Sequence, residues 1–299
     1  MLSSFRFWRE QGWHEISAEE YAVAWLSLGG SVATHPQVVE RLADLAGIAV
    51  RYLAVFDHNG TLHAAIATWG KYLALSKEIL KAKGKRGLYD LGNAEIIIPA
   101  TAEAKFRLRH RVRYLSHLNH EQVITAVEQS EGLALAREPE DYSKKFRYNQ
   151  RREQRLLEEA GGVISPILDL SPSEQARIYA DLFKRRWGFE ATGKNHLSEV
   201  FSLLREFMTG QVIYLNDLPV AIQILYRVEA PRWISLEYIN GGVDPEQREF
   251  SPGSVLSYIN TQEQWAYARS LNKTLRYSFG RADREYKERW CHKVPVYQV

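Results

Sequence analysis

The chain has 299 residues, which is enough for two ordinary domains or one large domain. Of these residues 45% are hydrophobic and 25% are charged, which is typical of a globular protein. Its single cysteine, Cys291, excludes an intramolecular disulfide, and no stretch approaches the roughly 20 apolar residues of a membrane-spanning helix. The net charge of +3 is uneven, because residues 105–155 hold 12 Lys and Arg against 7 Asp and Glu, whereas residues 156–299 hold 17 against 18. The positive charge therefore indicates a local patch rather than a uniformly cationic protein.

The start of the chain combines aromatic and basic side chains. Phe5, Phe7, Trp8 and Trp13 lie among two arginines, without the apolar run of a signal peptide. An interfacial anchor is one interpretation of this pattern. We expect a packed N-terminal strand instead.

Capping and turn signals predict the next elements. Ser17 and Glu20 form a capping-box pattern before the first of two helices over residues 17–46. Two β-rich runs, 48–56 and 61–69, flank an Asp-His-Asn-Gly turn that is typical of a hairpin. The rest of this half is expected to contain a polar helix and loop, the strand AEIIIPA, an extended segment at 105–113, a short helix from Asn119 to about Ser130, and the strand GLALARE.

The second half begins with a long helix that Ser143 is expected to cap and that the Gly161-Gly162 pair is expected to end. Helices are predicted over 171–187 and 195–209. They are followed by the strands QVIYL, PVAIQILYRV and RWISLEYI, a helix from SPGSVL to about residue 270, the strand TLRYSFG, a short helix or loop at ADREYKERW, and the strand HKVPVYQV. Both halves contain a strand–turn–strand unit and a later helix that leads into a strand. This repetition predicts two α/β units, 1–142 and 143–299.

The helix start SPGSVL is a candidate anion site. Pro252-Gly253 forces a turn and Ser254 is positioned to cap the helix, so backbone N–H groups and the positive end of the helix dipole face outward. We therefore predict that Ser251, Pro252, Gly253 and Ser254 hold phosphates of a cofactor. The alternative is an ordinary helix start without a ligand.

The order of three antiparallel strands, a helix with a small-residue start and a further strand resembles the core of the GNAT acyltransferases. The sequence is most similar to the FemAB-like branch of that superfamily. The residues that carry this resemblance are SKKFRYNQRREQRLLEEAGG, Pro219-Val220-Ala221, Ser251-Pro252-Gly253, Phe279-Gly280, Asp283, Tyr286, Lys287 and Trp290. The resemblance implies two tandem GNAT-like units with mixed, mostly antiparallel sheets flanked by helices, the second unit better preserved than the first. It implies acyl-CoA or aminoacyl-tRNA as the donor.

The whole chain is identified as a member of the Mig family, macrophage-inducible proteins of Gram-negative bacteria, from the segments SSFRFWREQGW and RYSFGRADREYKERWC. Membership implies virulence-related resistance to antimicrobial peptides and association with the inner membrane. A helix-turn-helix DNA-binding regulator was proposed for this family. The candidate helices here lie inside α/β units, which argues against that motif.

Four residues are candidates for catalysis. Lys287 is suited to hold a phosphate or to stabilise a developing oxyanion. Asp283 is suited to orient Lys287 or act as a base, and Tyr286 to protonate a leaving thiolate. Glu237 is a candidate general base if its side chain faces the cleft. Neighbouring residues of a strand point to opposite faces, so only one of Glu237 and Tyr238 can face the cleft. Each candidate also has a non-catalytic interpretation. The first is an exposed helix in which Asp283 and Lys287 form an ordinary ion pair, and the second is that Glu237 is a surface residue of a strand.

Two basic surfaces remain. Alternate residues of the 105–113 segment are cationic, and cations of the 143–160 helix recur at helical spacing. The members of these surfaces are Lys105, Arg107, Arg109, Arg111 and Arg113, and then Lys144, Arg147, Arg151 and Arg155. They are interpreted either as two solvated faces or as a shared polyanion site for an anionic membrane surface, a phosphorylated envelope precursor or RNA.

No metal-ligand spacing and no nucleotide-binding loop occur in the sequence. The prediction is a cytoplasmic protein, peripheral on the inner membrane, that acts as a GNAT/FemAB-like acyltransferase on an envelope component and contributes to resistance to antimicrobial peptides. A non-catalytic membrane-surface binding protein and a DNA-binding regulator are the alternatives.

Overall fold

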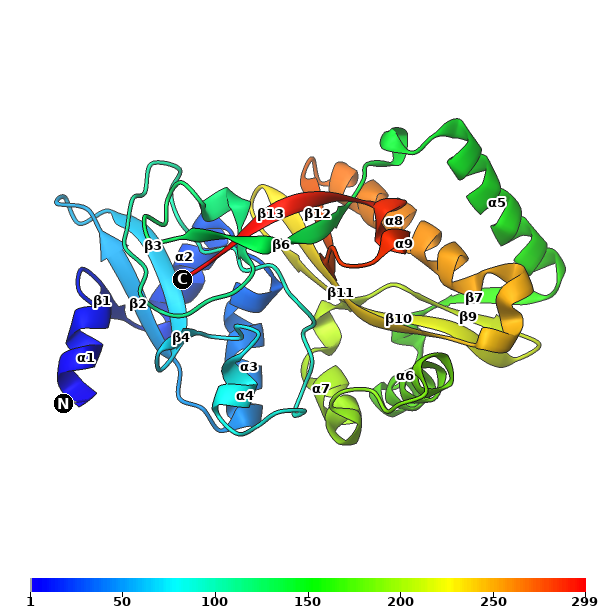
Figure 1. The fold of residues 1–299 in the computed structure, drawn as a ribbon, viewed down its shortest axis with the longest axis horizontal. Helices are drawn as coiled ribbons and strands as arrows, with labels where there is room; N and C mark the ends of the chain where they lie inside the picture. Colours follow the sequence, from blue (N-terminus) through cyan, green and yellow to red (C-terminus); the bar gives the residue numbers. More distant parts are fainter. Residues whose placement is uncertain (1) are drawn as a thin grey trace.

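The computed structural model describes residues 2–299. The N-terminal part contains a small antiparallel sheet in the order β1-β2-β3-β4, drawn in blue and cyan in Figure 1. Its strands are β1 (His14–Ile16), β2 (Arg51–Phe56), β3 (Leu62–Trp69) and β4 (Tyr72–Leu73). The helices of this part are α1 (Leu2–Arg9), α2 (Ala18–Leu28), α3 (Pro36–Ala46) and the short α4 (Ile79–Ala82).

The second sheet has nine strands in the order β5-β13-β6-β12-β11-β10-β9-β7, with β8 also paired to β10. The strands are β5 (Leu115–Ser116), β6 (Val127–Ala136), β7 (Gly162–Pro166), β8 (Met208–Thr209), β9 (Gln211–Leu215), β10 (Leu218–Glu229), β11 (Trp233–Val243), β12 (Thr274–Arg281) and β13 (Cys291–Gln298). Only β11 and β12 pair in parallel among these neighbours. The predicted mixed α/β fold with mostly antiparallel sheets is therefore confirmed.

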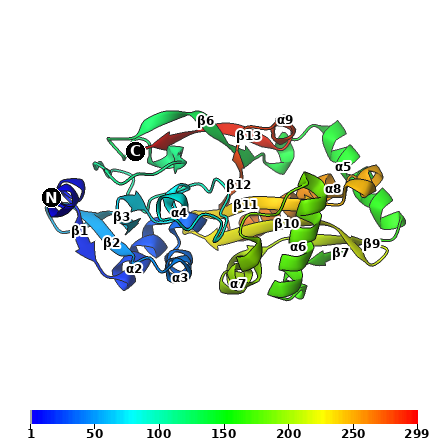
Figure 2. The ribbon, with the colours of Figure 1, turned by 60° about the horizontal axis from the view of Figure 1, so that its bottom comes forward.

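Helices cover both faces of the large sheet. The remaining α-helices are α5 (Lys144–Glu159), α6 (Pro172–Trp187), α7 (Leu197–Leu203), α8 (Pro252–Ser270) and α9 (Glu285–Glu288). Figure 2 shows α6 and α7 on one face and α8 with α5 on the other. Short 3-10 helices join the elements: η1 (Val32–Thr34), η2 (His117–Asn119), η3 (Pro139–Asp141), η4 (Ile167–Asp169), η5 (Lys194–His196), η6 (Arg205–Phe207) and η7 (Pro245–Phe250).

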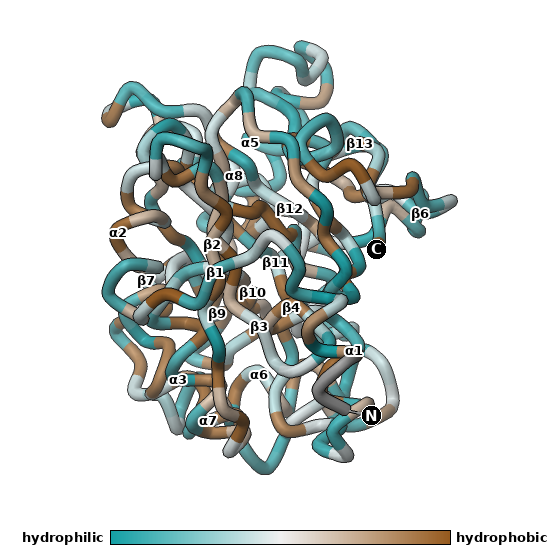
Figure 3. Tube along the Cα trace, turned by 90° about the vertical axis from the view of Figure 1, so that its left-hand side faces the viewer, coloured by the Kyte–Doolittle hydropathy of each residue, from teal (hydrophilic) through white to brown (hydrophobic). Residues whose placement is uncertain are grey.

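The predicted caps explain where several helices begin. The Ser17 and Glu20 side chains form the expected capping box at α2, and the Ser143 hydroxyl accepts a hydrogen bond from the amide of Phe146 at the start of α5. Asn216 and Asp217 have φ angles of 51° and 62°, which give the tight turn between β9 and β10. Apolar segments follow the buried strands and hydrophilic loops surround them (Figure 3).

Strands β6 and β13 join the two parts of the molecule. β6, from the first half of the chain, pairs with both β12 and β13, and the two strands cross from one part to the other in Figure 1. β13 also pairs with β5, and Val299 exchanges two backbone hydrogen bonds with Val112, of 3.1 and 3.2 Å. The large sheet thus contains strands from both sides of residue 142. The division into units 1–142 and 143–299 stays a prediction.

Side chains of β11 also join the parts. The Trp233 indole nitrogen donates to the carbonyl oxygen of Gly30 at 2.8 Å, and the amide of Val32 donates to the Ser235 hydroxyl at 3.2 Å. One hydrophobic core runs from α2 and β3 into β10. Burial of this shared core stabilises both parts together.

Three predicted elements were wrong. The chain starts with helix α1 rather than a packed strand, and Phe5, Phe7 and Trp8 are exposed on it. The helix expected from Asn119 to Ser130 is absent from the described chain, because the Asn119 side chain bonds the Ile98 backbone and residues 127–136 pair with β13 instead. AEIIIPA forms only isolated bridges, at Ile96 and Ala100.

Candidate active site

The site lies where β11 and β12 separate. The two strands pair from Trp233–Thr274 to Glu237–Ser278, and beyond that point β12 turns to pair with β6. Gly280 has a φ angle of 70°, in the left-handed region that favours glycine, at this change of direction. The rings of Tyr238 and Phe279, one from each strand, pack edge to face at the opening with centroids 5.2 Å apart.

A cavity of about 500 Å³ lies on the α8 side of the opening. Its lining includes the four residues predicted to hold a cofactor, Ser251, Pro252, Gly253 and Ser254. The cap itself differs from the prediction, because Ser251 is the N-cap residue, with a φ angle of 47° and no side-chain capping bond, and Ser254 lies inside α8. A Cβ atom on Gly253 would lie 2.9 Å from the Val243 side chain, so glycine is needed for α8 to approach β11.

Three arginines that the sequence analysis missed line the same cavity. Arg186, Arg248 and Arg289 come from α6, from η7 and from the end of α9, and none of them forms an ion pair within residues 2–299. The one carboxylate in the lining, Asp244, is already engaged by Arg185 and by the backbone of η7. The cavity therefore has an unneutralised positive charge beside the N-terminus of α8, which favours a polyanionic ligand.

A second cavity, of about 250 Å³, lies on the other side of the opening. It contains three of the predicted catalytic residues, Asp283, Tyr286 and Lys287. Tyr238, Phe279 and Tyr286 line both cavities, so these three rings form the wall between them. We call the first the donor cavity and the second the acceptor cavity, after the roles that are proposed for them under Proposed function.

Lys287 is held firmly in the acceptor cavity. Its ammonium group donates to the backbone oxygen of Arg281 at 2.6 Å and to Asp283 at 3.4 Å, and its side chain is 11% exposed. Burial lowers the pKa of Lys287, although the Asp283 carboxylate opposes this shift. The pKa of Asp283 is lowered because the cations of Arg281 and Lys287 outweigh the effect of its burial.

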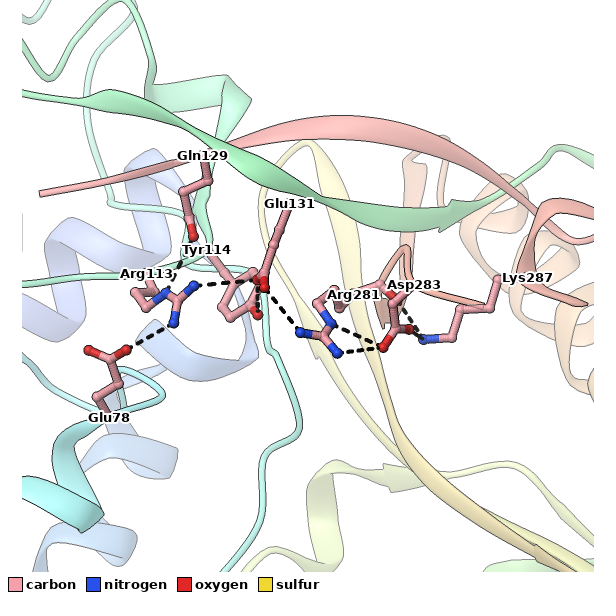
Figure 4. Close-up of polar contacts among 8 residues, drawn as sticks. All are labelled: Glu78, Arg113, Tyr114, Gln129, Glu131, Arg281, Asp283 and Lys287. Carbon is pink, nitrogen blue, oxygen red and sulfur yellow. Dashed lines mark hydrogen bonds and ion pairs between the residues drawn. The ribbon is translucent and has the colours of Figure 1, made fainter. Parts of the chain in front are cut away.

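A chain of charges continues from Lys287 into the N-terminal part (Figure 4). Arg281 pairs with Asp283 at 2.8 Å and with Glu131 at 3.0 Å, and Arg113 pairs with Glu131 at 3.5 Å and with Glu78 at 3.0 Å. Opposite charges alternate along the chain, so each group is held between its neighbours. The network fixes the acceptor cavity relative to the segment around α4.

The two tyrosines at the wall differ in exposure. Burial raises the pKa of Tyr238 and, less strongly, that of the half-exposed Tyr286, so both hydroxyls keep their proton at neutral pH. The positive charge of Arg186 opposes the shift at both tyrosines. Tyr286 therefore presents a hydroxyl donor where the two cavities meet.

Glu237, the fourth predicted catalytic residue, lies outside both cavities. Alternate residues of β11 face the N-terminal part, and its carboxylate accepts a hydrogen bond from the amide of Glu95 at 2.9 Å. Burial, with the neighbouring Glu95 carboxylate, raises the pKa of Glu237 well above its ordinary value. Of the neighbouring residues Glu237 and Tyr238, it is Tyr238 whose side chain faces the opening.

The sulfur of Cys291 is no candidate nucleophile in this structure. The residue is buried, and burial raises the pKa of its thiol to about 12, so the thiolate is a minor species at neutral pH. No cluster of metal-binding side chains occurs among the described residues.

The two predicted basic surfaces are not brought together. The 105–113 segment alternates exposed or half-buried cations with buried Phe106, Leu108, His110 and Val112, as expected, although it forms isolated bridges rather than a strand. It contacts β4 and Val299, whereas α5 lies at the opposite end of the molecule (Figure 1). The predicted shared polyanion site would therefore need a ligand long enough to reach from one end of the molecule to the other.

Several cations of these surfaces already have partners. Lys105 donates to the Glu121 backbone, Arg109 to the backbone of Trp8 at 2.5 Å, and Arg113 belongs to the charge network. On α5, Arg147 donates to the backbone of Pro139 at 3.1 Å and Arg155 pairs with Glu159 at 3.5 Å. Arg107, Arg111, Lys144 and Arg151 make no ion pair in the part of the chain that is described.

None of the helices within residues 2–299 is both long enough and apolar enough to cross a membrane. No curated protein matches the chain significantly by sequence.

Solved structures share the fold at low sequence identity. The crystal structure of FemX has a TM-score of 0.53 and 12% identity and covers 96% of each chain. The C-terminal domain (DUF2156) of a putative lysylphosphatidylglycerol synthetase from Agrobacterium fabrum has a TM-score of 0.51 and 11% identity over 94% of this chain and 90% of that one. L-PGS from Bacillus licheniformis has a TM-score of 0.50 and 11% identity over 95% and 92%. These similarities establish the fold that the FemAB-like resemblance implied. The Mig-14 family model matches residues 35–299, and the chain therefore belongs to the Mig-14 family.

Proposed function

We propose that this protein is an acyl or aminoacyl transferase of the GNAT/FemAB type. The observation that carries the proposal is that two cavities of different chemistry, on opposite sides of the β11–β12 opening, share a wall of three aromatic rings. A donor in one cavity and an acceptor in the other would meet at this wall. Such an arrangement holds two reactants in place for direct transfer.

The donor cavity is suited to a ligand that carries several phosphates. The N-terminus of α8 and the side chains of Arg186, Arg248 and Arg289 supply donors and positive charge. Acyl-CoA carries its phosphates at the far end of the pantetheine arm from the thioester, and aminoacyl-tRNA carries them in the backbone near its aminoacylated end. Both remain candidate donors.

In the proposed reaction, an amine or hydroxyl of the acceptor attacks the carbonyl carbon of a thioester or ester. A bond forms between the acyl carbon and the acceptor, and the bond from that carbon to the sulfur or oxygen of the donor breaks. Lys287 would stabilise the negative oxygen of the tetrahedral intermediate, and the Tyr286 hydroxyl would give its proton to the leaving group. The tyrosine then regains a proton from the attacking group through water.

The proposed setting is the bacterial envelope. FemX and a putative lysylphosphatidylglycerol synthetase are among the structural neighbours, and the second is named for a product in which lysine is joined to a phospholipid. The exposed Phe5, Phe7 and Trp8 of α1, next to Arg6 and Arg9, support peripheral attachment to an anionic membrane. We propose that transfer to an envelope component at the inner membrane contributes to resistance to antimicrobial peptides. A non-catalytic membrane-binding protein is the second candidate, because the same helix supports it without chemistry.

The test is a calorimetric titration of the purified chain with acetyl-CoA, longer acyl-CoA and aminoacyl-tRNA. Arg248→Ala should weaken binding of the true donor by about tenfold or more, because it removes a charge-assisted contact. Arg232→Ala is the matched control, since Arg232 is an exposed arginine at the β10–β11 turn, outside the donor cavity. No binding of any donor by the unaltered chain would favour the non-catalytic protein. Equal binding of a donor by both variants would place that donor outside the donor cavity.

A further inference from the structure

A third cavity, of about 370 Å³, lies in the N-terminal part beside α4. We call it the α4 cavity. Leu75, Ile79, Leu80 and Leu91 give it an apolar wall. It shares Lys77, Asp90 and Gly92 with the acceptor cavity, so the two are neighbours along one side of the large sheet.

The charges in the α4 cavity do not cancel. Two cations in its lining have carboxylate partners: Arg113 pairs with Glu78 at 3.0 Å, and Lys77 lies 3.9 Å from Asp90. Two more cations, Lys81 and Arg86, also line the cavity and form no ion pair with any described residue. An ammonium and a guanidinium without counter-charge, beside an apolar wall, favour an anion attached to a larger molecule.

The charge network sets the position of this cavity relative to the acceptor cavity. Glu78 and Arg113 line the α4 cavity, Asp283 and Lys287 line the acceptor cavity, and Glu131 and Arg281 connect them (Figure 4). The donor cavity lies on the other side of the β11–β12 opening. Phosphates of a donor and an anion in the α4 cavity would therefore not compete for one site.

We propose that the α4 cavity binds a phosphate ester of the acceptor, with Lys81 and Arg86 as its ligands, while the acceptor nucleophile lies beside Lys287. This inference rests on the proposed function, because it identifies the acceptor as a phosphorylated molecule. The phosphate belongs either to a lipid headgroup or to a soluble phosphate ester. The contacts on the protein are the same in both cases.

The experiment compares two double variants of the full chain. Lys81→Gln/Arg86→Gln removes the proposed ligands. Lys83→Gln/Lys85→Gln is the matched control, because it removes the same charge from exposed lysines of the same segment that do not line the cavity. The probes are glycerol 3-phosphate in calorimetry, and phosphatidylcholine vesicles with and without phosphatidylglycerol in sedimentation. Donor titrations are run on each variant.

We expect the Lys81/Arg86 variant to lose about tenfold or more in affinity for one of the two phosphate probes, and the control to stay within about twofold of the unaltered chain. A loss restricted to glycerol 3-phosphate identifies a soluble ester, and one restricted to phosphatidylglycerol vesicles identifies a lipid headgroup. Equal losses in both double variants, or no binding of either probe by the unaltered chain, would overturn the proposal. Failure of donor binding with an intact, variant-sensitive phosphate site would instead reject the transferase and keep the anion site.

Discussion

At the scale of single residues, the acceptor cavity brings together three of the four predicted catalytic residues, Asp283, Tyr286 and Lys287. Asp283 and Lys287 are four residues apart, and this spacing alone predicted their ion pair, as the interpretation that competes with a catalytic role. The catalytic roles, which the family resemblance implied, stay predictions. The three arginines of the donor cavity could not be found in this way. They lie on α6, η7 and the end of α9, far apart in sequence, and only the fold brings them to one wall. Which of Glu237 and Tyr238 faces the opening depended on the position of β11 relative to the N-terminal part, which no local pattern encodes.

The role of Lys287 predicts a specific kinetic defect. Lys287→Ala should lower the rate of acyl transfer by about 100-fold, because an oxyanion would lose its charged partner, while donor affinity stays nearly unchanged. Lys293→Ala, an exposed lysine on β13 outside both cavities, is the control and should transfer at the normal rate. Transfer that is undiminished in Lys287→Ala would exclude an electrostatic role for this residue.

Glu237 predicts a pH-dependent effect on stability. Its pKa is raised in the folded protein, so the folded state binds the proton more tightly than the unfolded chain does. The stability from this residue is therefore complete below about pH 4.5 and is lost as the pH rises toward the folded pKa. Glu237→Gln removes the ionisable group, so the variant should gain stability relative to the unaltered protein as the pH rises. Thermal unfolding between about pH 4 and pH 8 measures this, and a constant difference would contradict a raised pKa.

At the scale of secondary structure, the elements with local signals were predicted well. α2, α5 and α6 have side-chain caps at their first turns, α8 begins at Pro252-Gly253, and β9 to β12 are β-rich runs. The helix expected at 119–130 was wrong, whereas 105–113 is extended as expected but forms isolated bridges. Their backbone partners lie elsewhere: Arg111 bridges to Tyr72, and residues 127–136 pair with β13. An extended segment whose partners are distant has no local pattern that distinguishes it from a strand or a helix.

The start of α8 predicts a packing effect. Gly253→Ala places a methyl group 2.9 Å from the Val243 side chain and should destabilise the protein by about 1–3 kcal/mol and weaken donor binding. The double variant Gly253→Ala/Val243→Ala removes the opposing atoms and should recover part of the donor binding. Denaturant midpoints and donor titrations of the two variants provide the measurement. Donor binding that is equally weak in both would mean that crowding against β11 is not the cause.

At the scale of the whole molecule, the repeat in the sequence suggested two units, but not how strands are exchanged between them. β6 comes from the first half and lies between β12 and β13, and β13 ends beside Val112 in the N-terminal part. Such pairings connect residues more than 150 positions apart, as with Tyr297 and Glu128. No composition shift or linker marks them.

This arrangement predicts that the molecule unfolds as one unit. Removal of residues 294–299 would leave β5 and part of β6 without their partner strand, so it should lower hydrogen-exchange protection at β5 and Val112 as well as at β6. The conservative control is Lys293→Ala, which leaves the backbone pairing intact. Protection that falls at β6 alone would indicate that the N-terminal part is stable by itself.

The place of β13 also has a consequence for synthesis. Translation delivers this strand after every other strand of the sheet, yet it lies between β5 and β6, which the ribosome makes in the first half of the chain. While the second half is still being translated, the nascent N-terminal segment has an open strand edge that only β13 can close. The growing chain is therefore exposed to mispairing until β13 has been made, so it should depend on chaperones that shield nascent chains more than a protein with sequential strand order does.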